Sequence, residues 1–249
     1  MASGIIQLTL LLLAMGLALL PFFQFFRGTP HQLAAIKQLE ESMPAELLEE
    51  HEADWFQAWK ESGYDQQVFM PYFKQLDNET GTGYRECFSS AAAMVAAYYK
   101  KVRTDDEYNE IRAKYGDTTS VEAQLAALRS LGLEAEFRKD GDADMLELEI
   151  ENGRPVLVGW LHAGNMLLGE PPMCNGLGCG HWSVISGYAG KKSNDPEWIM
   201  QDPRGYPEME KGGHSNPHLG RNVRVRQAAF HQRWQADGPR TGWVILVNE

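Results

Sequence analysis

The sequence of 249 residues predicts an α+β fold from about residue 65 to the C-terminus. Segments whose apolar residues recur at helical spacing come first, and most of the short apolar runs typical of strands come later. The two kinds of segment do not alternate regularly, which argues against a doubly wound parallel sheet. The hydrophobic content of 43% is adequate for a real core.

An uncharged stretch at residues 4–26, GIIQLTLLLLAMGLALLPFFQFF, is long enough to span a bilayer. Pro21 and the four phenylalanines after it suit an interfacial end. No Lys or Arg precedes the stretch and no A-x-A site ends it, so we expect an uncleaved anchor in preference to a signal peptide or a buried helix. Residues 1–27 are therefore predicted to be a hydrophobic membrane anchor or signal segment of a membrane-anchored or exported protein, whose sidedness stays open.

Residues 28–64 are predicted to form a helical stalk or extension, because Leu33, Ile36, Leu39 and Met43 recur at helical spacing. A propeptide that masks a site is the alternative interpretation. The sequence then changes to turn-rich, extended chain, and the main domain is predicted to cover residues 65–249.

The elements of the domain are expected in the following order. The alanine-rich run 87–102 is predicted to be a helix, and Thr119 with Glu122 forms a capping box for a second helix that ends at Gly132. Strands are expected at 133–138, 154–162, 181–188, 197–202 and 242–247, with helices at 142–153 and 226–237.

The charge and the cysteines narrow the classes of function. A net charge of −11 gives no electrostatic case for nucleic acid as a partner. Cys174 and Cys179 lie in a Gly/Pro-rich loop and could form a disulfide in an exported chain, which would leave Cys87 as the free thiol. Two free thiols, or part of a zinc site that includes His181, are the alternatives.

Four residues at element boundaries match the needs of thiol catalysis. Cys87 opens a helix, whose partial positive charge would lower the pKa of the thiol. His181 begins one strand and Asp202 ends the next, so two adjacent antiparallel strands would place the carboxylate beside the imidazole. Gln75, upstream of the cysteine, could donate to an oxyanion together with the Cys87 backbone N–H.

These residues stand within strings that resemble papain-like cysteine peptidases, and more closely the bacteriocin-processing, double-glycine leader peptidases and their stand-alone relatives. The matching strings are KQLDN, ECFSSAAAMVAAYY, TSVEAQLAALRSLGLEAEF, LELEIENGRPVLVGW, GHWSVISGY, QDP and FHQRWQADGPRTGWVIL.

The resemblance covers roughly residues 70–249 and implies a papain-like fold, in which a helical N-terminal lobe packs the nucleophile helix on an antiparallel sheet. It implies Cys87 as nucleophile, His181 as base, Asp202 as the group that orients the imidazole, and Gln75 as oxyanion donor. No cofactor and no metal enters this scheme. Relatives often have Gly-Pro after the cysteine, where this chain has Phe88 and Ser89.

Other candidates have a structural alternative. Phe88, Trp160, His162 and Trp182 are predicted to flank a substrate groove, and packing aromatics are the alternative. Three further histidines could bind a metal ion, but their loop context predicts that they are exposed to solvent: His214, His218 and His231.

The resulting prediction is a membrane-tethered cysteine peptidase that hydrolyses peptide or amide bonds. Its partners would be a peptide or protein substrate, including cell-wall peptides, and a membrane contacted through residues 4–26. Two alternatives stay open. One is an acyltransferase on the same fold, resembling phytochelatin synthases, and the other is a non-catalytic binding or structural protein.

Overall fold

The computed structural model describes residues 64–174 and 180–249. The anchor and stalk predicted for residues 1–27 and 28–64 therefore lie outside the described residues, apart from Tyr64. The described chain from Tyr64 to Glu249 forms one compact unit. No helix within it has the length and apolarity that crossing a bilayer requires.

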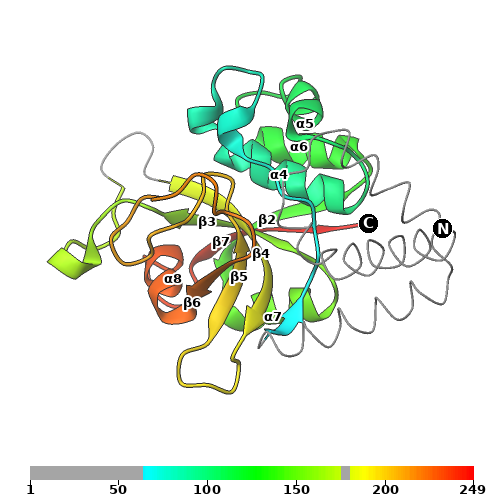
Figure 1. The fold of residues 1–249 in the computed structure, drawn as a ribbon. Helices are drawn as coiled ribbons and strands as arrows, with labels where there is room; N and C mark the ends of the chain where they lie inside the picture. Colours follow the sequence, from blue (N-terminus) through cyan, green and yellow to red (C-terminus); the bar gives the residue numbers. More distant parts are fainter. Residues whose placement is uncertain (1–63, 175–179) are drawn as a thin grey trace, which may run out of the picture. The chain divides into compact units, whose positions relative to one another are not determined.

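A seven-stranded antiparallel sheet forms the centre of this unit (Figure 1). Its strand order is β2-β7-β3-β4-β5-β6, and β1 pairs with β4 beside this path. The strands are β1 (Tyr64–Gln67), β2 (Glu134–Gly141), β3 (Val156–Leu161), β4 (Gly180–Ala189), β5 (Glu197–Gln201), β6 (Val223–Arg226) and β7 (Gly242–Asn248).

Helices cover both faces of the sheet (Figure 1). On one face lie α4 (Cys87–Tyr98), α5 (Asp105–Arg112) and α6 (Val121–Ser130), and on the other lie α7 (Ala143–Glu151) and α8 (Gln227–Trp234). Strand alternation divides the core accordingly, since Leu157 of β3 packs with α4 while Val156 and Val158 pack with α7 and α8. The predicted mixture of helices and antiparallel sheet is confirmed.

The α4 helix is buried on nearly all sides. Residues 88–97 are all buried, because the helix lies between the sheet and the helices α5 and α6. Its run of alanines lets the backbone approach the strands closely, which larger side chains would prevent. The helix that begins with Cys87 is therefore fixed by packing along its whole length.

Some local predictions were wrong or missed elements. Ser120, not Thr119, caps α6, because its side chain accepts a hydrogen bond from Ala123 N–H at 3.2 Å. The α5 helix was missed because it is almost entirely polar and Tyr108 is the apolar side chain that it buries. The short strand β6 was missed because VRVR is brief and runs directly into α8.

Phe88 and Trp182 connect the helical layer to the sheet. Their rings stack with centroids 3.9 Å apart and planes 3° apart, and Phe88 is only 1% exposed. Gly159 of β3 makes room for this pair, since a Cβ there would lie 2.9 Å from the Trp182 ring. The prediction that Phe88 and Trp182 line a groove was wrong, because both rings fill the core between α4 and β4.

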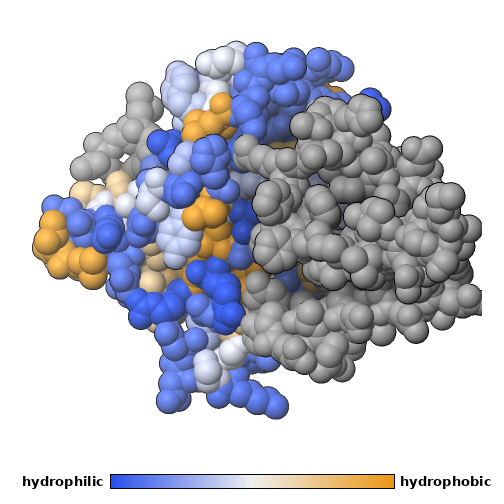
Figure 2. Space-filling model, in the orientation of Figure 1, coloured by the Kyte–Doolittle hydropathy of each residue, from blue (hydrophilic) through white to orange (hydrophobic). Residues whose placement is uncertain are grey.

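The visible surface is largely hydrophilic with separate apolar spots (Figure 2). One spot lies over the projecting turn η3 (Met166–Leu168), where Leu167 and Leu168 are exposed. The further short turns are η1 (Gln75–Asp77) and η2 (Gly83–Arg85), which precede α4.

We expect Phe88→Ala to lower the free energy of unfolding by about 3–5 kcal/mol, because it removes a fully buried ring from its stack. Urea unfolding followed by tryptophan fluorescence measures the change. Leu148→Ala, at an exposed position, is the matched control and should change stability by less than about 0.5 kcal/mol. Equal effects of the two substitutions would contradict the role given to the stack.

Candidate active site

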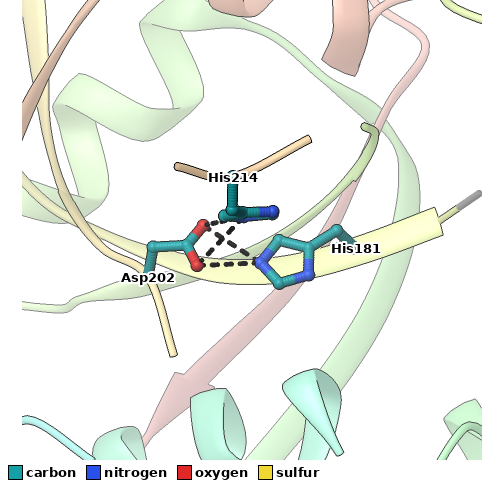
Figure 3. Close-up of side chains that lie close together, drawn as sticks. All are labelled: His181, Asp202 and His214. Carbon is teal, nitrogen blue, oxygen red and sulfur yellow. Dashed lines mark hydrogen bonds and ion pairs between the residues drawn. The ribbon is translucent and has the colours of Figure 1, made fainter. Parts of the chain in front are cut away.

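His181 and Asp202 meet because β4 and β5 are antiparallel neighbours. Val184 of β4 pairs with Gln201 of β5, so the chain leaving β5 passes the first residues of β4. His181 Nε2 lies 3.0 Å from each carboxylate oxygen of Asp202 (Figure 3). The sequence predicts that His181 and Asp202 lie side by side, because they stand at the ends of consecutive strands.

The Asp202 carboxylate is fully buried and receives hydrogen bonds from several directions. Besides His181, Ser183 Oγ donates at 2.9 Å and the backbone N–H of Arg204 donates at 2.9 Å. Burial opposes ionisation, but the two adjacent imidazoles outweigh it and hold the pKa of Asp202 well below its usual range. Asp202 is therefore a permanent anion at neutral pH.

His214 is the site residue that sequence reasoning missed. Its Nε2 lies 3.3 Å from the Asp202 carboxylate, its ring centroid lies 4.5 Å from that of His181, and its side chain is only 5% exposed (Figure 3). The prediction that His214 is exposed in a loop was wrong, because the loop folds back on itself through a bridge between Pro207 and His214. A glycine-rich loop has no apolar periodicity, so no sequence pattern indicates this packing.

Arg233 of α8 fastens this loop to the segment after β3. Its buried guanidinium donates to the carbonyls of Leu161, Ala163, Gly164 and Met209 at 2.6–3.1 Å. The two segments also meet directly, where Gly213 N–H donates to His162 O at 2.7 Å. These bonds place the rings of His162 and His214 with their centroids 5.7 Å apart.

The other aromatic residues and histidines predicted at the site differ in how deeply the structure buries them. Trp160 is buried, and its Nε1–H donates to Ser183 Oγ at 3.0 Å, so it supports the carboxylate network and does not line a groove. His162 is half-buried and stacks on the His181 ring with centroids 5.7 Å apart. His231 was wrongly predicted as exposed, since it accepts from Trp198 Nε1–H at 3.1 Å, whereas His218 is exposed as predicted.

Cys87 begins α4 and is a free cysteine. Burial raises the pKa of its thiol to about 11, although the nearby backbone groups of Trp182 and Phe88 act in the opposite direction. The expected lowering by the helix N-terminus is therefore outweighed by desolvation. Because Trp182 directly follows His181, these contacts place the thiol at the start of β4.

Burial also lowers the pKa of His181 to about 4, with Asp202 acting in the opposite direction. With a thiol pKa of about 11, the resting pair at pH 7 is a neutral thiol and a neutral imidazole. Asp202 is an acceptor, so the imidazole proton belongs on Nε2, and Nδ1, which points away from Asp202 in Figure 3, is the acceptor nitrogen.

Gln75 lies between the loop that follows β5 and the turn that precedes α4. It is fully buried, its backbone N–H donates to Pro203 O at 2.9 Å, and its Nε2 donates to Gly83 O at 2.7 Å. One proton of Nε2 is thereby used, and the second is left for another acceptor.

Two further predictions concern metals and disulfides. His181, Asp202 and His214 offer ligand atoms within 4.8 Å of one another, which is a spacing that could hold a metal ion. Their mutual hydrogen bonds account for this cluster without one. Cys174 is disulfide-bonded, and Cys179 lies outside the described residues.

The described chain thus combines a free cysteine at the start of α4 with a buried histidine–carboxylate pair, in a fold of helices and antiparallel sheet. The family model described as papain-like cysteine protease AvrRpt2 matches residues 65–215, which is more than half of the chain. The chain belongs to this family of papain-like cysteine peptidases, and the predicted resemblance is confirmed. No curated protein sequence matches the chain significantly.

Solved structures with a similar fold include peptidases of the double-glycine type. A double glycine motif protease from an AMS/PCAT transporter, in complex with the leader peptide, is 21% identical over 74% of this chain and 94% of its own, with a TM-score of 0.44. A putative C39-like peptidase from Bacillus anthracis is 14% identical over 74% of this chain and 98% of its own, with a TM-score of 0.49. Digestive procathepsin L2 from Tenebrio molitor larval midgut is 14% identical over 75% and 68%, with a TM-score of 0.39.

We expect His181 to lower the stability of the folded protein as the pH falls from about 6.5 to about 4, while Asp105, whose pKa burial raises to about 6, acts in the opposite direction. Folding lowers the pKa of His181 to about 4, so the unfolded chain binds more protons in this interval and the free energy of unfolding decreases. Below about pH 3.9, protonation of the unfolded Asp202 adds to the decrease, since its folded pKa is also lowered.

Urea unfolding at a series of pH values measures this dependence. Between about pH 6.5 and about pH 4, the free energy of unfolding of the His181→Gln variant, which lacks the imidazole, should fall less than that of the native protein. The same slope in both proteins would show that His181 is not the group responsible.

Proposed function

We propose that this peptidase cleaves peptide bonds with Cys87 as nucleophile, His181 as general base and acid, and Asp202 as the group that orients the imidazole. The observation that supports this proposal is the 3.0 Å contact between His181 Nε2 and a buried, permanently ionised carboxylate. That contact holds the Nε2–H tautomer, which leaves Nδ1 to accept the thiol proton.

The reaction proceeds in two stages. Cys87 Sγ bonds to the scissile carbonyl carbon while its proton moves to His181 Nδ1. The imidazolium then gives that proton to the leaving amine as the C–N bond breaks, and a thioester stays on Cys87. Water next gives a proton to His181 and attacks the thioester, and the carboxylic acid product leaves as the thiol regains its proton.

The oxyanion that forms in each stage needs donors beside the nucleophile. The Cys87 backbone N–H, at the open start of α4, is one donor. The second Nε2 proton of Gln75 is the other, since its first proton is held by Gly83 O and the amide is thereby fixed in place. In this scheme the Cys87 thiol is neutral at rest, and it gives up its proton only as its sulfur bonds to the carbonyl carbon of a bound substrate.

The substrate in this proposal is a peptide or protein, including cell-wall peptides. A structure similar in fold is a protease in complex with a leader peptide, which agrees with a peptide as substrate. Residues 4–26 would hold the peptidase domain at a membrane, so that a membrane-bound or neighbouring protein would be cleaved.

The direct test is cleavage of a peptide library by the full chain and by its Cys87→Ala variant. We expect Cys87→Ala to reduce kcat by at least about 10³-fold while peptide binding is retained, because the nucleophile is lost and the residues around it are unchanged. Added amines separate hydrolysis from acyl transfer, since a transferase would yield the amide of the added amine. Equal cleavage by both proteins would refute the assignment of Cys87.

His214 is a second anchor for the Asp202 carboxylate in this scheme. Its hydrogen bond of 3.3 Å is longer than that of His181, and Ser183 and the Arg204 N–H continue to hold the carboxylate if His214 is removed. Its loss should therefore weaken the orientation of the imidazole without abolishing it.

We expect His214→Ala to reduce kcat by about tenfold with little change in KM, because the loss of one hydrogen bond to a charged group costs about 1.5 kcal/mol or more. His214→Gln should recover part of the loss, since its amide also donates. His218→Ala, at an exposed histidine of the same loop, is the control and should behave as the native protein. Identical kinetics for His214→Ala and His218→Ala would remove His214 from the site.

A further inference from the structure

Arg204 places a positive charge beside the nucleophile. Its backbone N–H is fixed on Asp202 Oδ1 at 2.9 Å, and its half-buried side chain reaches toward the turn η2. There Nη1 donates to Tyr84 O at 3.4 Å, three residues before Cys87 in the chain. The guanidinium therefore lies where the loop after β5 faces the start of α4.

This guanidinium has no anionic partner within the described residues. No carboxylate in residues 64–174 or 180–249 lies within 4.0 Å of it, whereas Arg85 on the same turn pairs with Asp117 at 2.9 Å. Its hydrogen bond to Tyr84 O is long, and an arginine has five N–H donors in a fork that matches a carboxylate. Most of these donors are left for a ligand.

The Arg204 guanidinium lies at the protein surface, close to turns that carry exposed side chains. Tyr84 is 68% exposed and lies on the same turn, and Leu76, in η1 beside Gln75, is 52% exposed. The positive charge of Arg204 also acts at the Cys87 sulfur, where it favours the thiolate.

We propose that Arg204 binds a carboxylate of the substrate close to the bond that Cys87 attacks. The proposal rests on the peptidase function proposed above and specifies its substrate class, namely peptides with an anionic group beside the scissile bond. Two sources supply that chemistry: the side chain of Asp or Glu, and the terminal carboxylate of a peptide. A bidentate pair with the guanidinium fork would fix the substrate and would weaken at high salt.

Binding to the full-length Cys87→Ala protein tests the proposal without the need for turnover. The probes are short fluorescein-labelled Ala/Leu peptides with one Glu, Gln or Lys at each position in turn, as free acids and as C-terminal amides. We expect one Glu position, or the free terminus, to bind about tenfold tighter than its neutral counterpart. A difference at the Glu position identifies a side-chain carboxylate, and a difference between acid and amide identifies the terminus.

Variants of Arg204 show whether that preference belongs to this residue. Arg204→Gln in the Cys87→Ala background should remove the preference for the anionic peptide and leave binding of the neutral peptide unchanged. Arg204→Lys should keep part of the preference for the anionic peptide, because lysine retains the positive charge but lacks the forked N–H donors of the guanidinium. The matched control is Arg85→Gln, which removes an arginine of the neighbouring turn η2 that is paired with Asp117. This variant should keep the full preference for the anionic peptide.

The outcomes separate this proposal from the proposed function. A preference that persists in Arg204→Gln, or no preference for any anionic peptide, overturns the role of Arg204 whether or not the native protein cleaves. An Arg204-dependent preference supports the subsite even if no peptide in the set is cleaved. Cleavage by the native chain, measured in parallel, decides the peptidase function by itself.

Discussion

The stack of Phe88 on Trp182 is the contact on which the geometry of the site depends. Phe88 directly follows Cys87, and Trp182 directly follows His181, so rings 3.9 Å apart fix the start of α4 against the start of β4. Gly159 opens the space beneath the indole, and the alanines of α4 allow the helix to reach the sheet. A flexible pair at this point would let the thiol and the imidazole move independently.

The second constraint is a buried anion shared by several parts of the chain. Asp202 is held by side chains of β4, by the backbone of its own loop and by His214 of a loop that Arg233 fastens in place. An isolated buried carboxylate would be strongly destabilising, and these donors offset that cost. The same burial raises the pKa of Cys87 and lowers that of His181, so the resting site is neutral and charge separation accompanies the reaction.

Sequence reasoning succeeded where one strand or helix boundary decides the position of a residue. His181 and Asp202 were predicted to be neighbours because each stands at the end of a clear apolar strand and antiparallel strands reverse direction. It failed where a polar segment packs through specific contacts. His214 and α5 gave no periodic apolar signal, and Phe88, predicted to line a groove, is buried because the ring opposite it belongs to a strand almost one hundred residues away.

The sequence by itself determined the α+β class, the helix that begins at Cys87, the strands that present His181 and Asp202, and the resemblance to papain-like peptidases. These depend on local periodicity and on residue types at element ends, which the chain contains before it folds. Only the tertiary structure decided that two imidazoles share one carboxylate, that desolvation outweighs the helix N-terminus at the thiol, and that Arg204 reaches the turn before Cys87 without an anionic partner in the described chain. Such features arise from distances and burial between segments far apart in sequence, and no local pattern encodes them.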